Sequence, residues 1–448
     1  MSCKHTTPYF DSSRYASVVG FRPRTLKQIA NAAGLSVTDA TALPGPITYP
    51  QPLVLPGDDL AWDPQWPSQT LAETKKCLNL LERKSGGRHV VYVVGPPRIG
   101  NTAPKDMKNW TSLRLPKSKR TNLLQTPAPR TEDVMDYISA FYHGLPVKLL
   151  PQKLQFAAWE TASNRSSKKT RKLPEFPSAI GLQTSEEVIR IRCREVGAGP
   201  YAAQLNLSDL LDAAIAILPQ DAYALLMLVE QDIYEDEEDD FCCGRAYGGS
   251  RIACVSMARY HPAADNQQNV DLEHAWPVSH CTEYIERILL EADPEPAKKK
   301  VKATAQPNKI TKNGPSKNIL GAMYTAMDAY PKDLESMTLE AYAGLWLGRF
   351  CRTASHELGH CFGMDHCIYY ACVMQGTASV AEDMRQPPYM CPVDLTKLLY
   401  TTGATVEEHH QALLRYCSRF KDQHGALFWT PFAAWLTRRL AHSRVEIL

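Results

Sequence analysis

Several features that would place this chain in a familiar class are missing from its sequence. No run of about eighteen apolar residues occurs, so no segment is expected to cross a membrane. The first residues, MSCKHTTPYFDSSRYASVV, lack the apolar core and the small-residue cleavage site of a secretory signal peptide. The net charge is only +2, which argues against a dedicated nucleic-acid binder. We therefore expect an intracellular protein, cytoplasmic, nuclear or both, with neither a membrane nor a nucleic acid as partner.

A disulfide framework and a phosphate loop are also not indicated. The thirteen cysteines are odd in number, and five of them cluster between Cys351 and Cys391. This distribution favours metal binding and reduced thiols over the paired cysteines of a small secreted protein. The glycine-rich segment 244–249 lacks the lysine and serine of a phosphate-binding loop.

The segment HELGHCFGMDHC has the spacing of a zinc-binding helix followed by a turn. His356 and His360 lie four residues apart, so one helix face can present both imidazoles to a zinc ion at about 2.0–2.1 Å. Glu357 lies beside the first histidine, where it can act on a metal-bound water. Gly363 permits a left-handed turn that can bring His366 back as a third ligand. The fourth position then stays open, as in catalytic zinc sites.

The residues before this segment support the same interpretation. Apolar residues recur at helical spacing over residues 339–364, and no proline interrupts them. The alternative is an amphipathic helix with two surface histidines and an unrelated loop histidine. Three histidines, one glutamate and one glycine at fixed spacings, with a predicted helix before the glycine, favour zinc.

Three cysteines, a methionine and an aspartate follow the histidines, at Cys367, Cys372, Met374, Cys391 and Asp394. Together with the histidine segment they resemble the archaemetzincin family of metzincin metalloproteases. The pattern of that family is HExxHxxGxxHC-x4-C-x-M, followed some sixteen or seventeen residues later by C-x-x-C. The resemblance covers about residues 350–394, with weaker similarity upstream.

The resemblance implies a role for each of these residues. The three histidines would bind a catalytic zinc, Glu357 would be the general base and acid, and Met374 would form a turn beneath the metal. Cys367, Cys372 and Cys391 would hold a second, structural zinc, with Asp394 in place of the last cysteine of the family. A carboxylate can ligate zinc, so a site of three cysteines and an aspartate is chemically feasible. The alternative is three buried thiols without a metal.

Two other catalytic features are conceivable near the histidines. A nucleophilic cysteine–histidine pair is disfavoured, because Cys361 follows His360 directly and points about 100° away from it on a helix. Tyr369 and Tyr370 could stabilise an oxyanion, although packing is the commoner role of such tyrosines.

The order of predicted elements indicates an α/β (α+β) fold. Strands are expected at 89–94, 145–150, 222–229 and 252–257, and helices at 131–143 and 205–217. These elements predict a metzincin-like catalytic domain, with a mixed twisted sheet, an active-site helix and a zinc cleft. C-terminal helices follow at 395–400, 406–421 and 431–442.

Composition divides the chain into three parts. Residues 1–85 are rich in proline and predict an extended, partly ordered arm with one helix at 25–33. Residues 86–400 would form the peptidase domain, and 401–448 a helical extension. The lysine- and proline-rich insertion 294–318 is expected to be disordered, and its KKKVK core is either a nuclear-localisation signal or a solvated loop.

These observations predict a zinc-dependent metallopeptidase that uses a metal-activated water. Its substrate would be a peptide or protein bound in extended form, added as a strand beside the edge of the strand at 252–257. The alternative is a zinc-stabilised module that binds proteins or peptides without significant hydrolysis. The intact Glu357 argues against that alternative, because a purely structural site needs no carboxylate there. The choice between aminopeptidase and endopeptidase, and the oligomeric state, stay open.

Overall fold

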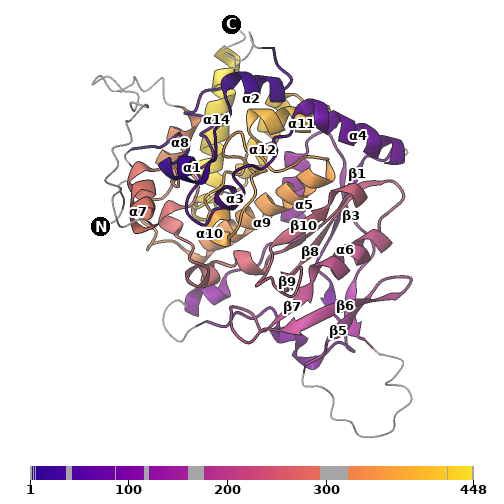
Figure 1. Ribbon diagram of the computed structural model, residues 1–448. Helices are drawn as coiled ribbons and strands as arrows, with labels where there is room; N and C mark the ends of the chain where they lie inside the picture. Colours follow the sequence, from indigo (N-terminus) through magenta and orange to yellow (C-terminus); the bar gives the residue numbers. More distant parts are fainter. Residues whose placement is uncertain are drawn as a thin grey trace, which may run out of the picture.

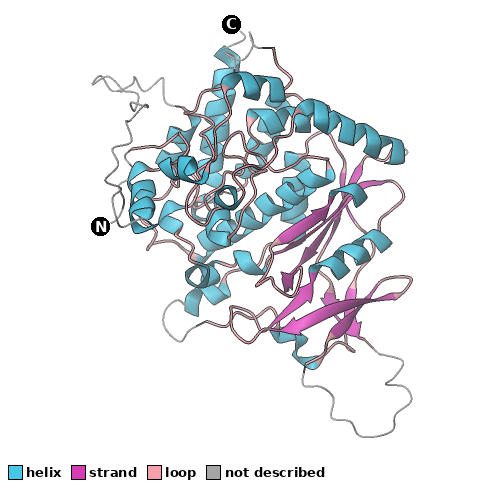
Figure 2. Cartoon of the chain, in the orientation of Figure 1, coloured by secondary structure: helices cyan, strands magenta, loops and turns pink. Residues whose placement is uncertain are grey.

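Helices and two β-sheets make up the mixed α/β fold of the chain (Figures 1 and 2). The computed structural model describes residues 3, 5, 7–36, 43–85, 87–115, 121–159, 176–292, 321–420 and 422–445. The predicted fold class is confirmed, but the strands form two sheets where one was expected. No helix in the described ranges has the length and apolar character needed to cross a bilayer.

The first sheet has five strands in the order β10-β11-β8-β1-β3. Its strands are β1 (Val90–Val94), β3 (Val147–Leu149), β8 (Ala222–Val229), β10 (Gly244–Tyr247) and β11 (Ile252–Ser256). All neighbours run parallel except β10, which is antiparallel to β11. Four of these strands were predicted, because each is a short run of apolar residues. The expectation that β11 offers a free edge was wrong: β10 covers one side of it and β8 the other.

The three middle strands β1, β8 and β11 are buried at every position, as continuous apolar strands predict, whereas the outer strands β3 and β10 are partly exposed. Leu226 and Leu228 of β8 belong to the core that contains helix α9 (Leu339–Cys361), whereas Leu225 and Met227 point to a second core. The sheet thus supports the long helix on one side and the rest of the β-structure on the other.

The second sheet lies beyond helix α6 (Leu207–Ala216), with the order β2-β4-β5-β6-β7-β9 (Figure 1). Buried residues of α6 pack in the core that both sheets share. Helix α6 begins at Asn206, whose side chain accepts a hydrogen bond from the backbone N–H of Asp209 at 3.1 Å. The strands are β2 (Arg98–Ile99), β4 (Gln155–Ala158), β5 (Ala179–Gln183), β6 (Val188–Glu195), β7 (Ala203–Asn206) and β9 (Asp232–Tyr234).

Helices cover the other face of the first sheet. Helix α5 (Thr131–Phe141) and helix α9 pack there, and α9 lies beside β10 (Figure 1). The predicted C-terminal helices are confirmed as α11 (Pro392–Thr402), α12 (Val406–Cys417) and α14 (Trp429–Val445). The remaining α-helices after residue 200 are α7 (Thr282–Ala292), α8 (Ala322–Ala329), α10 (Val380–Asp383) and α13 (Asp422–Gly425). Short 3₁₀ helices are η2 (Lys105–Asn109), η3 (Thr121–Gln125), η5 (Gly248–Ser250), η6 (Ala258–Tyr260), η7 (Pro262–Gln268) and η8 (Leu272–His274).

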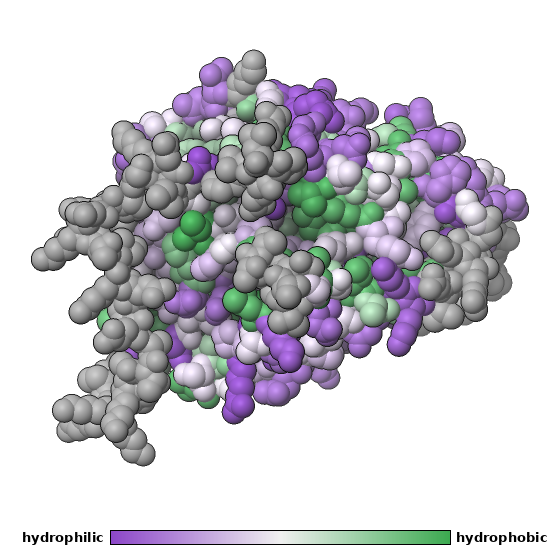
Figure 3. Space-filling view, turned by 90° about the horizontal axis from the view of Figure 1, so that it is seen from above, coloured by the Kyte–Doolittle hydropathy of each residue, from purple (hydrophilic) through white to green (hydrophobic). Residues whose placement is uncertain are grey.

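The N-terminal region carries more helix than its proline content predicts. Besides the expected α2 (Leu26–Ala32), it contains α1 (Arg14–Val19), α3 (Asp59–Trp62) and α4 (Leu71–Ser85). The three-part division of the chain stays a prediction, and the insertion 294–318 lies outside the described residues. Seen from above, hydrophobic side chains gather in the middle of the molecule's face, with hydrophilic ones around them (Figure 3).

Candidate active site

A cavity of about 1010 Å³ lies where β10, α9 and the segment after α9 meet. It is also bordered by residues of the N-terminal region, among them Trp66 and Gln69. Its lining includes these charged or imidazole side chains: Asp240, Arg245, Arg352, His356, Glu357, His360, Asp365, His366 and Asp383. The predicted histidines and Glu357 therefore share one cleft.

Helix α9 positions these groups, and the helix itself is held by an N-terminal cap and by a buried ion pair. Its N-terminus is capped by Thr338, whose hydroxyl accepts from the backbone N–H of Ala341 at 3.4 Å. The buried guanidinium of Arg349 forms an ion pair with Asp265, with Nη1 and Oδ1 2.7 Å apart. The helix ends at Cys361, three residues earlier than predicted.

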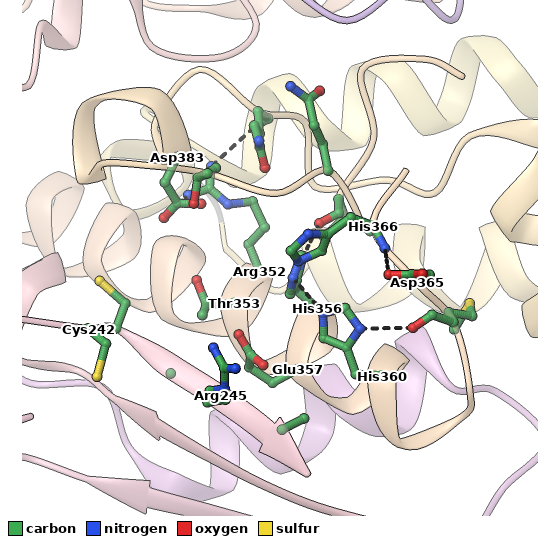
Figure 4. A pocket seen from close by; sticks show the side chains of 18 of the residues that line it. Cys242, Arg245, Arg352, Thr353, His356, Glu357, His360, Asp365, His366 and Asp383 are labelled. Atoms are coloured by element: carbon green, nitrogen blue, oxygen red, sulfur yellow. Dashed lines mark hydrogen bonds and ion pairs between the residues drawn. The ribbon is translucent and has the colours of Figure 1, made fainter. Parts of the chain in front are cut away.

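The imidazoles of His356 and His360 point at one another from successive turns of α9 (Figure 4). The Nδ1 of His356 lies 2.7 Å from the carbonyl oxygen of Val373, and the Nδ1 of His360 lies 2.8 Å from that of Met364. A carbonyl can only accept, so both Nδ1 atoms carry the proton and both Nε2 atoms carry a lone pair. These two Nε2 atoms are 3.0 Å apart. Two lone pairs at this distance repel unless a cation lies against them.

His366 completes the group through a turn at Gly363, which has a φ of 73°. This is the left-handed conformation that the sequence predicts at this glycine. The ring of His366 packs beside Trp66 with centroids 5.1 Å apart, and its Nδ1 is buried without a hydrogen bond to any described residue. Gly376 leaves space there, because an added Cβ would lie 2.8 Å from this nitrogen.

The donor set fits a zinc ion. One nitrogen of each of the three histidines lies within 4.8 Å of the others. Burial lowers the pKa of His356 well below its usual value and lowers that of His366 to about 4. The rings are therefore neutral, which is the state that ligates metals. Three imidazoles suit zinc and other transition metals rather than magnesium or calcium, which prefer oxygen ligands.

Glu357 lies beside the histidines with its side chain against β10. A Cβ added to Gly244 would come 3.3 Å from the Cγ of Glu357, so β10 approaches the carboxylate closely. Burial raises the pKa of Glu357 to about 8, and the nearby Arg245 acts in the opposite direction. Figure 4 shows Arg245 facing this carboxylate. A carboxyl group of this kind can exchange a proton near neutral pH.

Met374 lies directly beneath the helix turn between the two α9 histidines. A Cβ at Gly359 would lie only 2.5 Å from the Sδ of Met374, so glycine is needed for this contact. The carbonyl of the neighbouring Val373 meets the Nδ1 of His356. The role of Met374 as a floor turn beneath a metal stays a prediction.

The second predicted group is also brought together. Cys367, Cys372, Cys391 and Asp394 are buried, with one ligand atom of each within 4.8 Å of the others. The Sγ atoms of Cys367 and Cys391 are 3.6 Å apart, and the Cys372 thiol donates to Asp394 Oδ2 at 3.3 Å. Burial acts to raise the pKa of Cys367, but hydrogen bonds from its neighbours outweigh it and hold that pKa well below the usual value.

Lys397 is a member of this second group that the sequence interpretation missed. Its Nζ lies 2.8 Å from Asp394 Oδ1 and 3.2 Å from the Oε1 of Gln69. The signal was present as an i, i+3 spacing of opposite charges, but the helix was predicted to begin at residue 395, whereas α11 begins at Pro392 and includes Asp394. Burial and the neighbouring Cys367 raise the pKa of Asp394 to about 6, although Lys397 opposes this.

Other cleft residues carried no signal in the sequence. Arg352 and Asp383, which both line the cavity, form a buried ion pair of 2.7 Å, and Arg245 reaches the cavity from β10. Tyr369 donates its hydroxyl to the carbonyl of Gln69, and Tyr370 packs on Tyr49, so both tyrosines serve packing.

Comparison with known proteins gives a family match around α9. Residues 335–399 match the family model described as Peptidase family M54. Archaemetzincin-2 of Homo sapiens is 25% identical over 226 residues, which are 50% of this chain and 50% of the relative. Archaemetzincin-1 of Rattus norvegicus is 33% identical over 210 residues, which are 47% of this chain and 33% of the relative. The chain thus matches about half the length of Archaemetzincin-2 and less of Archaemetzincin-1.

One similar solved structure is that of Archaemetzincin (amzA) from Methanopyrus kandleri. It is 16% identical, with 71% of this chain and 98% of that chain covered, at a TM-score of 0.29.

Proposed function

We propose that the chain is a zinc-dependent peptidase of the archaemetzincin family, whose cleft lies over the end of α9. One observation carries the proposal. The Nε2 atoms of His356 and His360 are 3.0 Å apart while both Nδ1 atoms are held by carbonyl oxygens. This arrangement presents two lone pairs to one point, and His366 adds a third nitrogen.

His356, His360 and His366 would hold the zinc. When bound there, zinc supplies Lewis acidity, which polarises a carbonyl group and lowers the pKa of water. The carbonyl groups of Val373 and Met364 keep the two α9 imidazoles in the required tautomer and orientation.

Glu357 would transfer the proton. Its carboxylate accepts a proton from the attacking water and then delivers it to the amine nitrogen that leaves the substrate. Burial raises the pKa of Glu357 and so favours its protonated form, which is the form that donates to the leaving amine. The close approach of β10 at Gly244 keeps bulk water away from one side of this group.

The substrate would be an extended peptide that pairs with β10. This strand ends the sheet, and its outer edge pairs with no other strand in the described part of the chain. Gly244, Arg245 and Ala246 of β10 line the cavity, so a peptide added here would run past the histidines.

A second zinc would be held by Cys367, Cys372, Cys391 and Asp394. The thiols of Cys372 and Cys391 both donate to Asp394 Oδ2, at 3.3 and 3.4 Å, so this oxygen faces the sulfur atoms. The other carboxylate oxygen is occupied by Lys397. Three thiolates and a carboxylate give a group with an excess of negative charge around zinc, and the Lys397 ammonium offsets part of it.

The test is a peptide-library cleavage profile of the zinc-loaded full chain and of two variants. Glu357→Gln should keep its zinc and lose cleavage, because the amide cannot accept the proton. Glu340→Gln is the matched control, since Glu340 lies exposed in the first turn of the same helix. Cleavage that survives in Glu357→Gln, or in wild type treated with chelator, would contradict the proposal. Peptide capture without cleavage by the wild type would favour the binding module.

A further inference from the structure

Another group of metal-binding side chain types lies where the N-terminal segment meets α7. None of its members lines the cleft. The backbone N–H of Thr282 donates to the carbonyl of Thr7 at 2.9 Å, and that of Tyr9 donates to His280 at 3.0 Å. This short pairing holds residues 7 and 9 along the start of α7. Residues separated by more than two hundred positions are thereby brought together.

Two cysteines and two histidines meet at this junction. The Sγ atoms of Cys3 and Cys281 are 3.3 Å apart, far longer than a disulfide bond of about 2.05 Å. Two thiolates around a tetrahedral zinc with bonds of about 2.3 Å would be separated by about 3.8 Å. A ring nitrogen of His5 and one of His274 lie within 4.8 Å of each other and of the Cys3 sulfur.

His274 has the surroundings of a metal ligand. It is 1% exposed, and its ring stacks on Tyr284 with centroids 4.1 Å apart. Its Nδ1 lies 2.7 Å from Asp271 Oδ2, so a carboxylate fixes the tautomer that leaves a lone pair on Nε2. That Nε2 is buried and has no hydrogen-bond partner among the described residues. A buried lone pair without a donor costs free energy unless a cation satisfies it.

His5 presents the same feature from the other chain segment. Its Nε2 is also buried without a hydrogen bond to any described residue, and its ring meets that of His274 at a centroid distance of 5.1 Å. The buried Nε2 atoms of His5 and His274 thus lack hydrogen-bond partners among the described residues, and the thiols of Cys3 and Cys281 lie at the same junction.

We propose that Cys3, His5 and His274, whose ligand atoms lie within 4.8 Å of one another, bind one zinc ion, and that the Cys281 thiol beside Cys3 turns from Glu283 to become the fourth ligand. This ion would fasten the N-terminal segment to α7. Two thiolates and two neutral imidazoles are a common donor set of structural zinc sites. The set balances the charge of Zn²⁺, as a partly buried site requires. Binding releases one proton from each thiol to solvent, and Cys281 gives up the hydrogen bond that it donates to Glu283 at 2.9 Å.

The structural consequence is a cross-link between distant parts of the chain. Cys3 and Cys281 are 278 positions apart, so a metal that joins them closes a very long loop. Closing such a loop lowers the entropy of the unfolded chain and stabilises the folded one. The proposal does not depend on peptidase activity, because no residue of the cleft takes part.

The experiment measures zinc per chain in the full-length protein by mass spectrometry of the metal after gel filtration. Cys3→Ser and His274→Phe are the test variants; phenylalanine keeps the stacking on Tyr284 but cannot ligate. Cys77→Ser and His89→Ala are matched controls, since Cys77 is exposed and His89 is outside all three groups. Circular dichroism verifies the fold of each variant.

Each test variant should contain one zinc fewer per chain than wild type and the controls, with a lower melting temperature. Equal zinc content in wild type and Cys3→Ser would overturn the proposal. So would a non-reduced wild-type mass lower by two hydrogens at an unchanged zinc count, which would indicate a Cys3–Cys281 disulfide. None of these variants changes a residue of the histidine site or of the group formed by Cys367, Cys372, Cys391 and Asp394. The difference in zinc content therefore tests this proposal even if the peptidase proposal fails.

Discussion

The ammonium of Lys397 lies 2.8 Å from Asp394 Oδ1, and both side chains are at most 1% exposed. The two carboxylate oxygens of Asp394 therefore have different partners. Oδ2 accepts hydrogen bonds from two thiols, and Oδ1 pairs with the buried ammonium of Lys397. The aspartate that replaces the last cysteine of the family pattern thus has a partner one helical turn away.

The pairing predicts strong coupling between these two positions. Lys397→Met should lower the free energy of unfolding by about 3–5 kcal/mol, because it leaves a buried carboxylate without its cation. Asp394→Ala should cost a similar amount for the opposite reason. The double variant should cost clearly less than the sum, as chemical denaturation of all four proteins would reveal. If the double variant loses as much free energy of unfolding as the two single variants together, the two side chains do not stabilise each other.

Metal content provides a separate test of the second zinc. Asp394→Ala should reduce the zinc content by one ion per chain, whereas Asp394→Cys should retain it, because a thiolate can take the same position. Atomic absorption on dialysed protein measures both. Asp394→Asn keeps the size and shape of the side chain but removes its charge. It should also lose zinc, because a neutral amide is a poor ligand. An unchanged count in Asp394→Ala would indicate three buried thiols without metal.

Local patterns in the sequence predicted most of the site and the first sheet. The histidines, Glu357 and Gly363 are set by spacings within one helix and one turn, which backbone geometry fixes. Strand β8 is apolar at every position but one, Tyr223, so its burial on both faces could be read directly. The second sheet was missed because its strands other than β6 have only two to five residues, which is too short for a clear period.

Contacts between distant segments could not be predicted in this way. Cys3 and Cys281 are 278 positions apart, and they are brought together by the backbone pairing of Thr7 with Thr282 and of Tyr9 with His280, which no local period encodes. Trp66 and Gln69 reach the cleft from a proline-rich region whose composition predicts little helix. Tertiary packing decides these placements.

Gly359 predicts a steric test of the helix floor. In Gly359→Ala the new Cβ would lie 2.5 Å from the Sδ of Met374, so either the thioether or the helix turn must move. We expect a loss of about 1–3 kcal/mol in stability and weaker zinc retention, because the turn carries His356 and His360. Thermal unfolding and zinc content measure the two effects. Gly249→Ala is the control, since nothing lies within 4 Å of its added Cβ.

Shortening the Met374 side chain should restore part of the zinc retention that Gly359→Ala loses. Met374→Ala combined with Gly359→Ala vacates the space beneath the turn, so zinc retention should recover in part even though packing is lost. A double variant that retains zinc no better than Gly359→Ala would show that the contact with Met374 is not the cause.

Buried histidines away from the cleft predict acid sensitivity of the fold. Burial lowers the pKa of His409 from 6.5 to about 4, and it lowers the pKa of His280 likewise to about 4. Each ring is neutral in the folded chain but takes up a proton in the unfolded chain below pH 6.5. The unfolded state then binds more protons, so this contribution to stability is complete above pH 6.5 and is lost as the pH falls toward 4.

The size of the effect follows from the pKa difference, at about 3 kcal/mol for each histidine. His409→Phe removes one such group while keeping the aromatic packing against Phe141, where the ring centroids are 5.7 Å apart. Its melting temperature should therefore fall less than that of wild type between pH 7 and pH 5. Acid also releases zinc from histidine ligands, but equally in both proteins, so the difference between them reports His409 alone. Parallel pH profiles would show that His409 does not resist protonation in the folded chain.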